Sequence, residues 1–217
     1  MLNFRRDFIK IKFNFGAILL LFSLILSNEI TYACVYLICA AIHELGHLWA
    51  AKILNIKIEE MTFDIAGAKI LPAGQINSYK NEFLLCAAGP LASMCLALFC
   101  AIACYGNFDI NILFEEEISN ASQVLSAIIL FSTIQAVINL IPIDGFDGGR
   151  MLKSITVYHF GVSTGQKISY ILTFIFSLIL WMTSVYFLIK IGQGLSLFSF
   201  SICMFLKLFE NENSGQL

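Results

Sequence analysis

The sequence has few charged residues: 13% of its 217 positions are Asp, Glu, Lys or Arg, whereas 59% are apolar and the mean hydropathy is +0.82. This is too little charge for a water-soluble domain, which needs a polar shell around its core. The net charge is only −2, and no basic run indicates a nucleic-acid surface. The composition therefore excludes a soluble globule and predicts an integral membrane protein in a lipid bilayer, with no nucleic-acid partner.

Six apolar segments are candidate membrane spans. They are residues 15–27, 30–54, 81–105, 121–141, 168–189 and 191–208. The first follows basic residues, as a signal peptide would, but the sequence after it lacks a convincing small-x-small cleavage site, so a retained span is favoured. The sequence predicts an all-α polytopic protein of about six transmembrane helices. One membrane domain is expected over residues 1–209, followed by a short polar tail at 210–217.

The stretch from residue 56 to 78 is the least apolar part of the interior. Residues 59–64 partly alternate between polar and apolar, Gly67 offers a turn, and a second short run ends at Pro72. This pattern predicts a short cytoplasmic β-hairpin between the second and third spans.

The basic residues indicate the orientation, because loops rich in Lys and Arg stay on the cytoplasmic side. With the N-terminus inside, every Lys and Arg except Lys190 lies at or near the cytoplasmic face. The outer loop, residues 106–120, carries acidic residues and no Lys or Arg. Both termini are therefore predicted to be cytoplasmic.

The second span contains the motif H-E-x-x-H, as His43-Glu44-Leu45-Gly46-His47. Residues i and i+4 share one face of a helix, so both imidazoles can bind one zinc ion, with Glu44 placed to act as a general base. Composition alone predicts only about 0.002 occurrences of this pattern in such a chain. A carboxylate within a span also costs about 2.5–3.5 kcal/mol on insertion scales, which favours a functional role.

Catalytic zinc normally takes three protein ligands and a water, so a third ligand is needed. His159 is the only other histidine. The Pro- and Gly-rich segment 139–150 offers Asp144 and Asp147, and irregular backbone at membrane depth is tolerated only where it is buried or lines a cavity. Spacing does not choose between the two aspartates.

Together these residues resemble the site-2 proteases, a family of intramembrane zinc metalloproteases. The family signatures are H-E-x-x-H and, on a later span, N-x-x-P-x-x-x-L-D-G. The second appears here as Asn139-Leu140-Ile141-Pro142 followed by Phe146-Asp147-Gly148, with Phe146 in place of Leu. Residues 88–93, Ala-Gly-Pro-Leu-Ala-Ser, are similar to the family's G-P-x-x-N, with Ser93 in place of Asn.

This resemblance implies one zinc ion per chain, held by His43, His47 and Asp147. Glu44 would be the catalytic base, and Asn139 would support the substrate or the transition state. The implied activity is cleavage of transmembrane or membrane-associated protein substrates in regulated intramembrane proteolysis, with regulatory membrane proteins as further candidate partners. The hairpin could hold an opened substrate segment by strand addition. The compact chain resembles the sporulation-type bacterial branch, which processes a pro-sigma factor, so the bacterial cytoplasmic membrane is the expected location.

Two other functions are alternatives to this one. Zinc proteases with a Glu ligand in E-x-x-x-D are disfavoured, because Ser119 and Asn120 stand four residues after Glu115 and Glu116. The alternative from another class is a membrane zinc transporter or a non-catalytic metal-binding chaperone. A transporter should have ligands along a path across the membrane, whereas these candidates gather near one face.

Overall fold

The computed structural model describes residues 10–13, 30–64, 67–74, 76, 78–104, 121–191, 198 and 201–202. These fall into two compact units, Met1–Ile138 and Asn139–Leu217. A single membrane domain over residues 1–209 stays a prediction.

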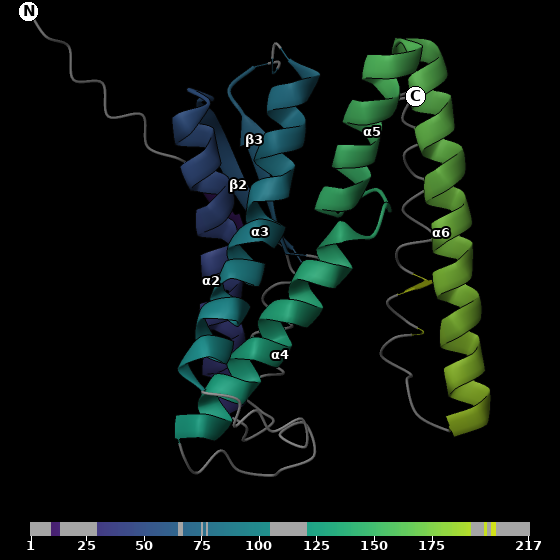
Figure 1. Ribbon diagram of the computed structural model, residues 1–217. Coiled ribbons are helices and arrows are strands. Elements are labelled where there is room, and N and C mark those ends of the chain that lie inside the picture. Colours follow the sequence, from purple (N-terminus) through teal and green to yellow (C-terminus); the bar gives the residue numbers. More distant parts are fainter. Residues whose placement is uncertain are drawn as a thin grey trace, which may run out of the picture. The chain divides into compact units, whose positions relative to one another are not determined.

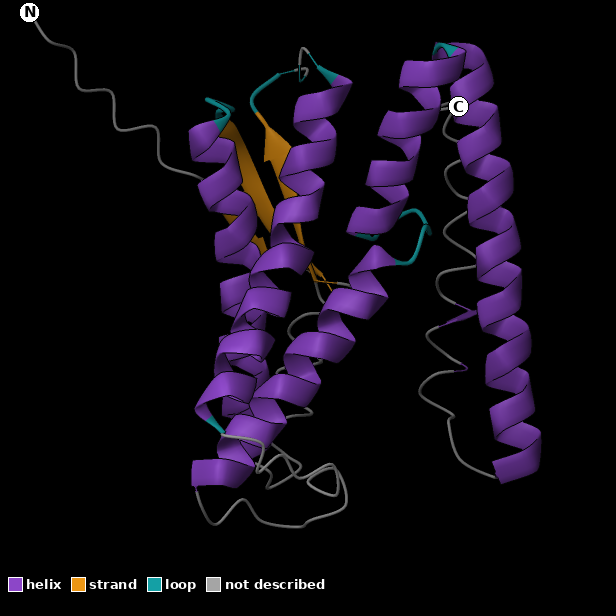
Figure 2. Cartoon of the chain, in the orientation of Figure 1, coloured by secondary structure: helices purple, strands orange, loops and turns teal. Residues whose placement is uncertain are grey.

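The first unit contains three long helices, namely α2 (Ile30–Ile53), α3 (Tyr79–Ala103) and most of α4 (Ala121–Leu140), as Figures 1 and 2 show. Each is apolar and long enough to cross a bilayer. Their large apolar side chains face outward, and Leu45, Trp49 and Phe99 are each more than half exposed. Small side chains lie inside, which is the arrangement expected where lipid is the solvent.

Helices α2 and α3 approach each other closely through small residues. A Cβ atom added to Gly46 of α2 would lie 2.6 Å from the Ala88 carbonyl oxygen and 2.7 Å from the Ala92 Cβ atom. Helix α4 packs on α2 around a buried cluster of Val35, Cys39 and Ala127. These contacts fix the inward face of α2, on which the motif histidines lie.

Strands β2 (Ile58–Asp64) and β3 (Gly67–Pro72) form an antiparallel pair between α2 and α3 in the chain, in the stretch where a hairpin was predicted. Its cytoplasmic location stays a prediction. A third strand, β1 (Lys10–Phe13), was not predicted, and it pairs in parallel with β2 in the order β1-β2-β3. Ion pairs join Lys10 to Glu59 and Lys12 to Glu60, at 3.8 and 2.6 Å.

The second unit contains α5 (Asp147–Phe160) and the long apolar helix α6 (Val162–Ile191), which pack against each other. Gly165 of α6 makes the contact close, since an added Cβ atom would lie 2.5 Å from the Val157 backbone. The sequence did not predict α5 as a helix, because it begins with two consecutive glycines after the initial Asp147.

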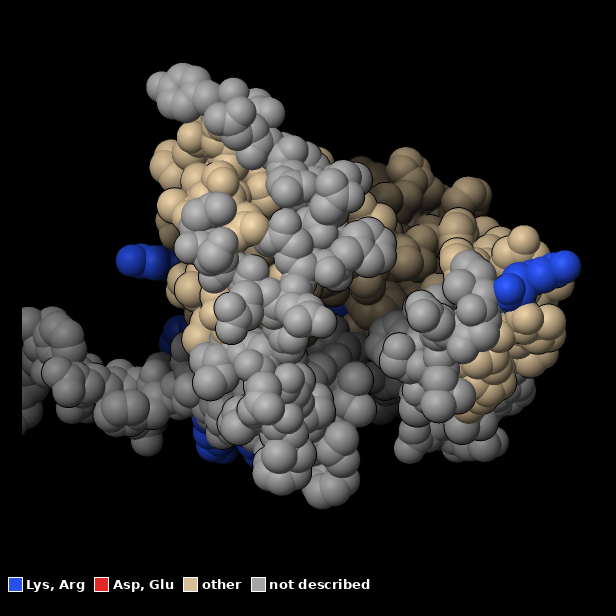
Figure 3. All heavy atoms as spheres, turned by 90° about the horizontal axis from the view of Figure 1, so that it is seen from below, with Lys and Arg blue, Asp and Glu red and all other residues tan. Residues whose placement is uncertain are grey.

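Four of the six predicted spans match helices in the described residues: α2, α3, α4 and α6. The predicted first span, 15–27, lies outside the described residues, as does most of the last, 191–208. The topology of six membrane spans therefore stays a prediction. Figure 3 views the molecule from below, and the described atoms visible there belong mostly to uncharged residues, with scattered Lys or Arg atoms.

Candidate metal centre

The inward face of α2 carries His43, Glu44 and His47 away from solvent, with exposed fractions of 2%, 8% and 4%. Leu45 and Trp49, on the outward side of the same helix, are 58% and 70% exposed. The helix is therefore polar inside and apolar outside over these turns, the reverse of a helix in a soluble protein. Burial of this kind is the expected setting for polar groups with a function in a membrane protein.

His47 is oriented by the main chain of α3. Its Nδ1 atom lies 2.8 Å from the Leu85 carbonyl oxygen. Because a carbonyl only accepts hydrogen bonds, Nδ1 carries the proton and the Nε2 atom of neutral His47 presents a lone pair. That is the form in which an imidazole binds a metal ion.

His43 is oriented by a side chain of α3. Its Nδ1 atom lies 3.0 Å from Ser93 Oγ, and Ser93 is fully buried. Ser93 stands where the family pattern has Asn, and the sequence left its role open. The structure places its hydroxyl beside one of the motif histidines.

Gly89 of α3 lies directly under both imidazole rings. A Cβ atom there would come within 2.2 Å of His47 Nε2 and 2.8 Å of His43 Nε2. Both Nε2 atoms therefore point toward the same small region, and the absence of a side chain at Gly89 leaves room for it. This convergence fits a metal ion held by two imidazoles.

Asp147 is the first residue of α5, just after a turn. Close packing of backbone fixes this helix start: a Cβ atom on Gly148 would lie 2.3 Å from the Leu140 carbonyl oxygen, and one on Gly149 would lie 2.2 Å from the Ile143 carbonyl oxygen. Neither position accepts a larger residue without movement of the main chain.

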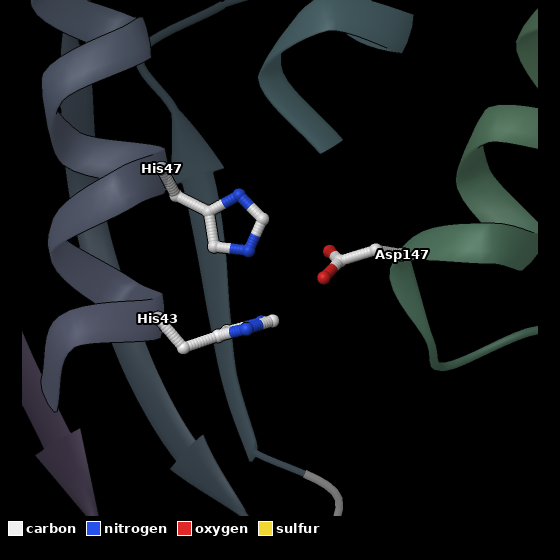
Figure 4. A group of neighbouring side chains, drawn as sticks. All are labelled: His43, His47 and Asp147. Atoms are coloured by element: carbon white, nitrogen blue, oxygen red, sulfur yellow. The ribbon is translucent and has the colours of Figure 1, made fainter. Parts of the chain in front are cut away.

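His43, His47 and Asp147 form a group that could hold a metal ion, the one such group among the described residues (Figure 4). One ligand atom from each residue lies within 4.8 Å of the others. Two imidazoles and a carboxylate are a donor set that suits zinc. Figure 4 also shows both imidazoles projecting from the same side of α2.

The other candidate residues lie elsewhere. Asp144 is exposed in the turn before α5, and His159 is exposed near the opposite end of that helix from Asp147, a separation of about 18 Å at 1.5 Å per residue. Neither belongs to the group that could hold a metal. Asn139 is half-buried in the last turn of α4, and its role stays a prediction.

Gly89 and the Leu85 carbonyl are contributors to the site that sequence reasoning missed. The G-P pair at Gly89 marked a family resemblance, but nothing in it indicated contact with the histidines. A backbone carbonyl leaves no signal in a sequence at all.

Residues 31–183 match peptidase family M50. The match covers well over half of the chain, so the chain belongs to this family, the site-2 proteases. The prediction of the family from the two motifs is confirmed.

Two similar proteins come from Methanocaldococcus jannaschii. A curated zinc metalloprotease is 29% identical over 153 residues, a region that covers 67% of this chain and 41% of the relative. The chain thus matches less than half the length of that relative. A solved site-2 protease structure superimposes with a TM-score of 0.66 at 22% identity, covering 92% of this chain and 89% of the other, and this likeness shows a shared fold.

Proposed function

We propose that this chain is an intramembrane zinc metalloendopeptidase that cleaves membrane-embedded or membrane-proximal protein segments. The proposal rests on the buried residues His43, Glu44 and His47 of α2. The Nε2 atoms of the two histidines converge over Gly89. Membership of a peptidase family supports the same reaction class. No described feature favours the transporter or chaperone alternative.

One zinc ion would be held by His43, His47 and Asp147. Bound there, zinc would supply a Lewis acid that activates water and polarises a peptide carbonyl. The chain's own contribution is to hold both imidazoles as neutral ligands, through the bonds of their Nδ1 atoms to Ser93 and Leu85.

Glu44 would be the general base. It follows His43 directly on α2, and its 8% exposed side chain keeps the carboxylate in surroundings from which most water is excluded. Its carboxylate oxygen would take a proton from the attacking water and then give that proton to the leaving amine. Asn139 would support the substrate or the transition state with its amide group.

The substrate must offer an extended segment, because helical hydrogen bonds shield its peptide bonds. In the described sheet, β2 is paired on both edges, whereas β3 is paired with β2 alone. The outer edge of β3 would take the opened substrate as an added strand. Single proline substitutions along β3 each remove one N–H, so cleavage that is unchanged by all of them would contradict this role.

The finer biological role rests on the family resemblance. We propose regulated intramembrane proteolysis in a bacterial cytoplasmic membrane, with both termini cytoplasmic and with regulatory membrane proteins as partners. A pro-sigma factor substrate, as in the sporulation-type branch, is the first to test.

The test is cleavage of a panel of single-span substrates in proteoliposomes, before and after removal of zinc by a chelator. The proposal predicts loss of cleavage on chelation and recovery on addition of zinc. Zinc flux across the same liposomes without cleavage of any substrate would contradict the protease assignment and favour transport.

A further inference from the structure

The two motif histidines are held by unlike partners. His47 Nδ1 meets a main-chain carbonyl, which belongs to the backbone of α3 whatever the side chain at Leu85 is. His43 Nδ1 meets the hydroxyl of Ser93, a single replaceable side chain. The hydrogen bond at His43 Nδ1 therefore depends on the side chain at position 93, whereas the bond at His47 Nδ1 does not depend on the side chain at position 85.

The hydroxyl also differs from the carbonyl in what it can do. A carbonyl oxygen only accepts, which fixes the proton of His47 on Nδ1. A serine hydroxyl can accept or donate, so His43 presents its Nε2 lone pair when Ser93 Oγ accepts from Nδ1–H. Ser93 is 0% exposed, so no bulk water is available to replace the hydroxyl if it is removed.

Helix α3 contacts both sides of the His43 ring. Gly89 and Ser93 are four residues apart and share one face of the helix. An added Gly89 Cβ atom would lie 2.8 Å from Nε2 of His43, and Ser93 Oγ lies 3.0 Å from Nδ1. One turn of α3 therefore fixes the direction in which each ring nitrogen points.

We infer that Ser93 is a positioning residue, which holds His43 in the metal-binding tautomer and so sets the affinity of the site for zinc. This inference rests on the proposed zinc site but not on the identity of the substrate. Removing an outer hydrogen-bond partner of a metal ligand typically lowers metal affinity by about 10- to 100-fold. A loss in this range is expected for Ser93→Ala.

The experiment compares purified full-length wild type, Ser93→Ala, Ser93→Thr and Ser132→Ala. The dissociation constant for zinc is measured by competition with a chromophoric chelator, and the visible spectrum of the cobalt-substituted protein reports the ligand geometry. Ser132→Ala is the matched control, because Ser132 is also 0% exposed and its hydroxyl donates to Cys39 Sγ at 3.3 Å. Ser93→Thr keeps a hydroxyl at position 93.

The inference predicts weaker zinc binding and an altered cobalt spectrum in Ser93→Ala, near wild-type values in Ser132→Ala, and recovery in Ser93→Thr. Wild-type zinc affinity and spectrum in Ser93→Ala would overturn it, and so would an equal loss in Ser132→Ala. If Ser93→Ala binds zinc as wild type does while wild type cleaves substrate, the inference fails and the protease assignment stands. If the affinity pattern holds but wild type cleaves nothing, the assignment fails and the inference stands.

Discussion

Two regions supply the candidate ligands, and each fixes its ligand differently. His43 and His47 come from consecutive turns of one long helix, where helical periodicity puts them on one face and the partner atoms of α3 orient the rings. Asp147 comes from the first residue of a short helix after a turn, where the course of the main chain decides its position. A side chain at Gly89 would meet imidazole rings, whereas one at Gly148 would meet backbone carbonyls. Changes in the first region should alter the site, and changes in the second should also alter the fold.

Asp147→Asn should have the largest effect on zinc binding. The substitution keeps the size of the side chain but removes its negative charge and its strength as a ligand. We expect the loss of affinity to exceed the roughly 100-fold typical of a lost outer partner, measured by chelator competition. Asp144→Asn, in the exposed turn three residues earlier, is the matched control. Equal losses in both variants would contradict the choice of Asp147.

Gly89→Ala should separate metal binding from stability. Alanine is a better helix former than glycine by about 1 kcal/mol, so the helix itself should not be weakened. The new methyl group would lie 2.2 Å from His47 Nε2 and would displace the ring. We expect about a 100-fold loss of zinc affinity, comparable to the loss of an outer partner, with little change in thermal unfolding. Wild-type zinc affinity in this variant would contradict the convergence of the imidazoles over Gly89.

Gly148→Ala should act chiefly on stability. Its Cβ atom would lie 2.3 Å from the Leu140 carbonyl oxygen, and backbone cannot move aside as a side chain can. Overpacking of this kind costs about 1–3 kcal/mol, to be measured as a lower free energy of unfolding in detergent. A variant as stable as wild type would show that the turn before α5 is looser than described.

The smallest effect, a change in stability with pH, is expected in the β-sheet, outside the two regions that supply the candidate ligands. The hydrogen bond from Lys12 holds the pKa of the Glu60 carboxyl below its usual range. A lowered folded-state pKa contributes stability above the unfolded-state pKa, and this is lost as the pH falls through the folded-state value. The protection of the β1 amide hydrogens from exchange, taken relative to the intrinsic exchange rate at each pH, should therefore fall in acid, and Glu60→Gln should remove that pH dependence. An unchanged pH profile in Glu60→Gln would contradict the role of this ion pair.

The sequence predicted what depends on local pattern. Apolar length located α2, α3, α4 and α6, and alternation located β2 and β3. The H-E-x-x-H spacing named His43 and His47, whereas Asp147 was named only by the family resemblance. The contacts of Ser93 and Gly89 with the histidines could not be predicted, because they depend on how α3 packs on α2.

Two elements were missed for different reasons. Helix α5 begins with consecutive glycines, whose low helix propensity is overridden by close packing on the preceding turn. Strand β1 alternates Lys and Ile, then Lys and Phe, and the acidic pair Glu59-Glu60 was available to match it. The alternating pattern of β1 was therefore visible in the sequence, but the strand with which β1 pairs, β2, lies some fifty residues away in the chain.

The most direct test of the account is Glu44→Gln, with zinc content and substrate cleavage measured on the same preparation. The amide keeps the size of the side chain but cannot act as a base. We predict that the variant retains zinc at the wild-type level and that cleavage falls by about 10²- to 10⁴-fold, the usual contribution of a general base. Cleavage at the wild-type rate by zinc-loaded Glu44→Gln would contradict the central claim that this buried carboxylate carries the proton.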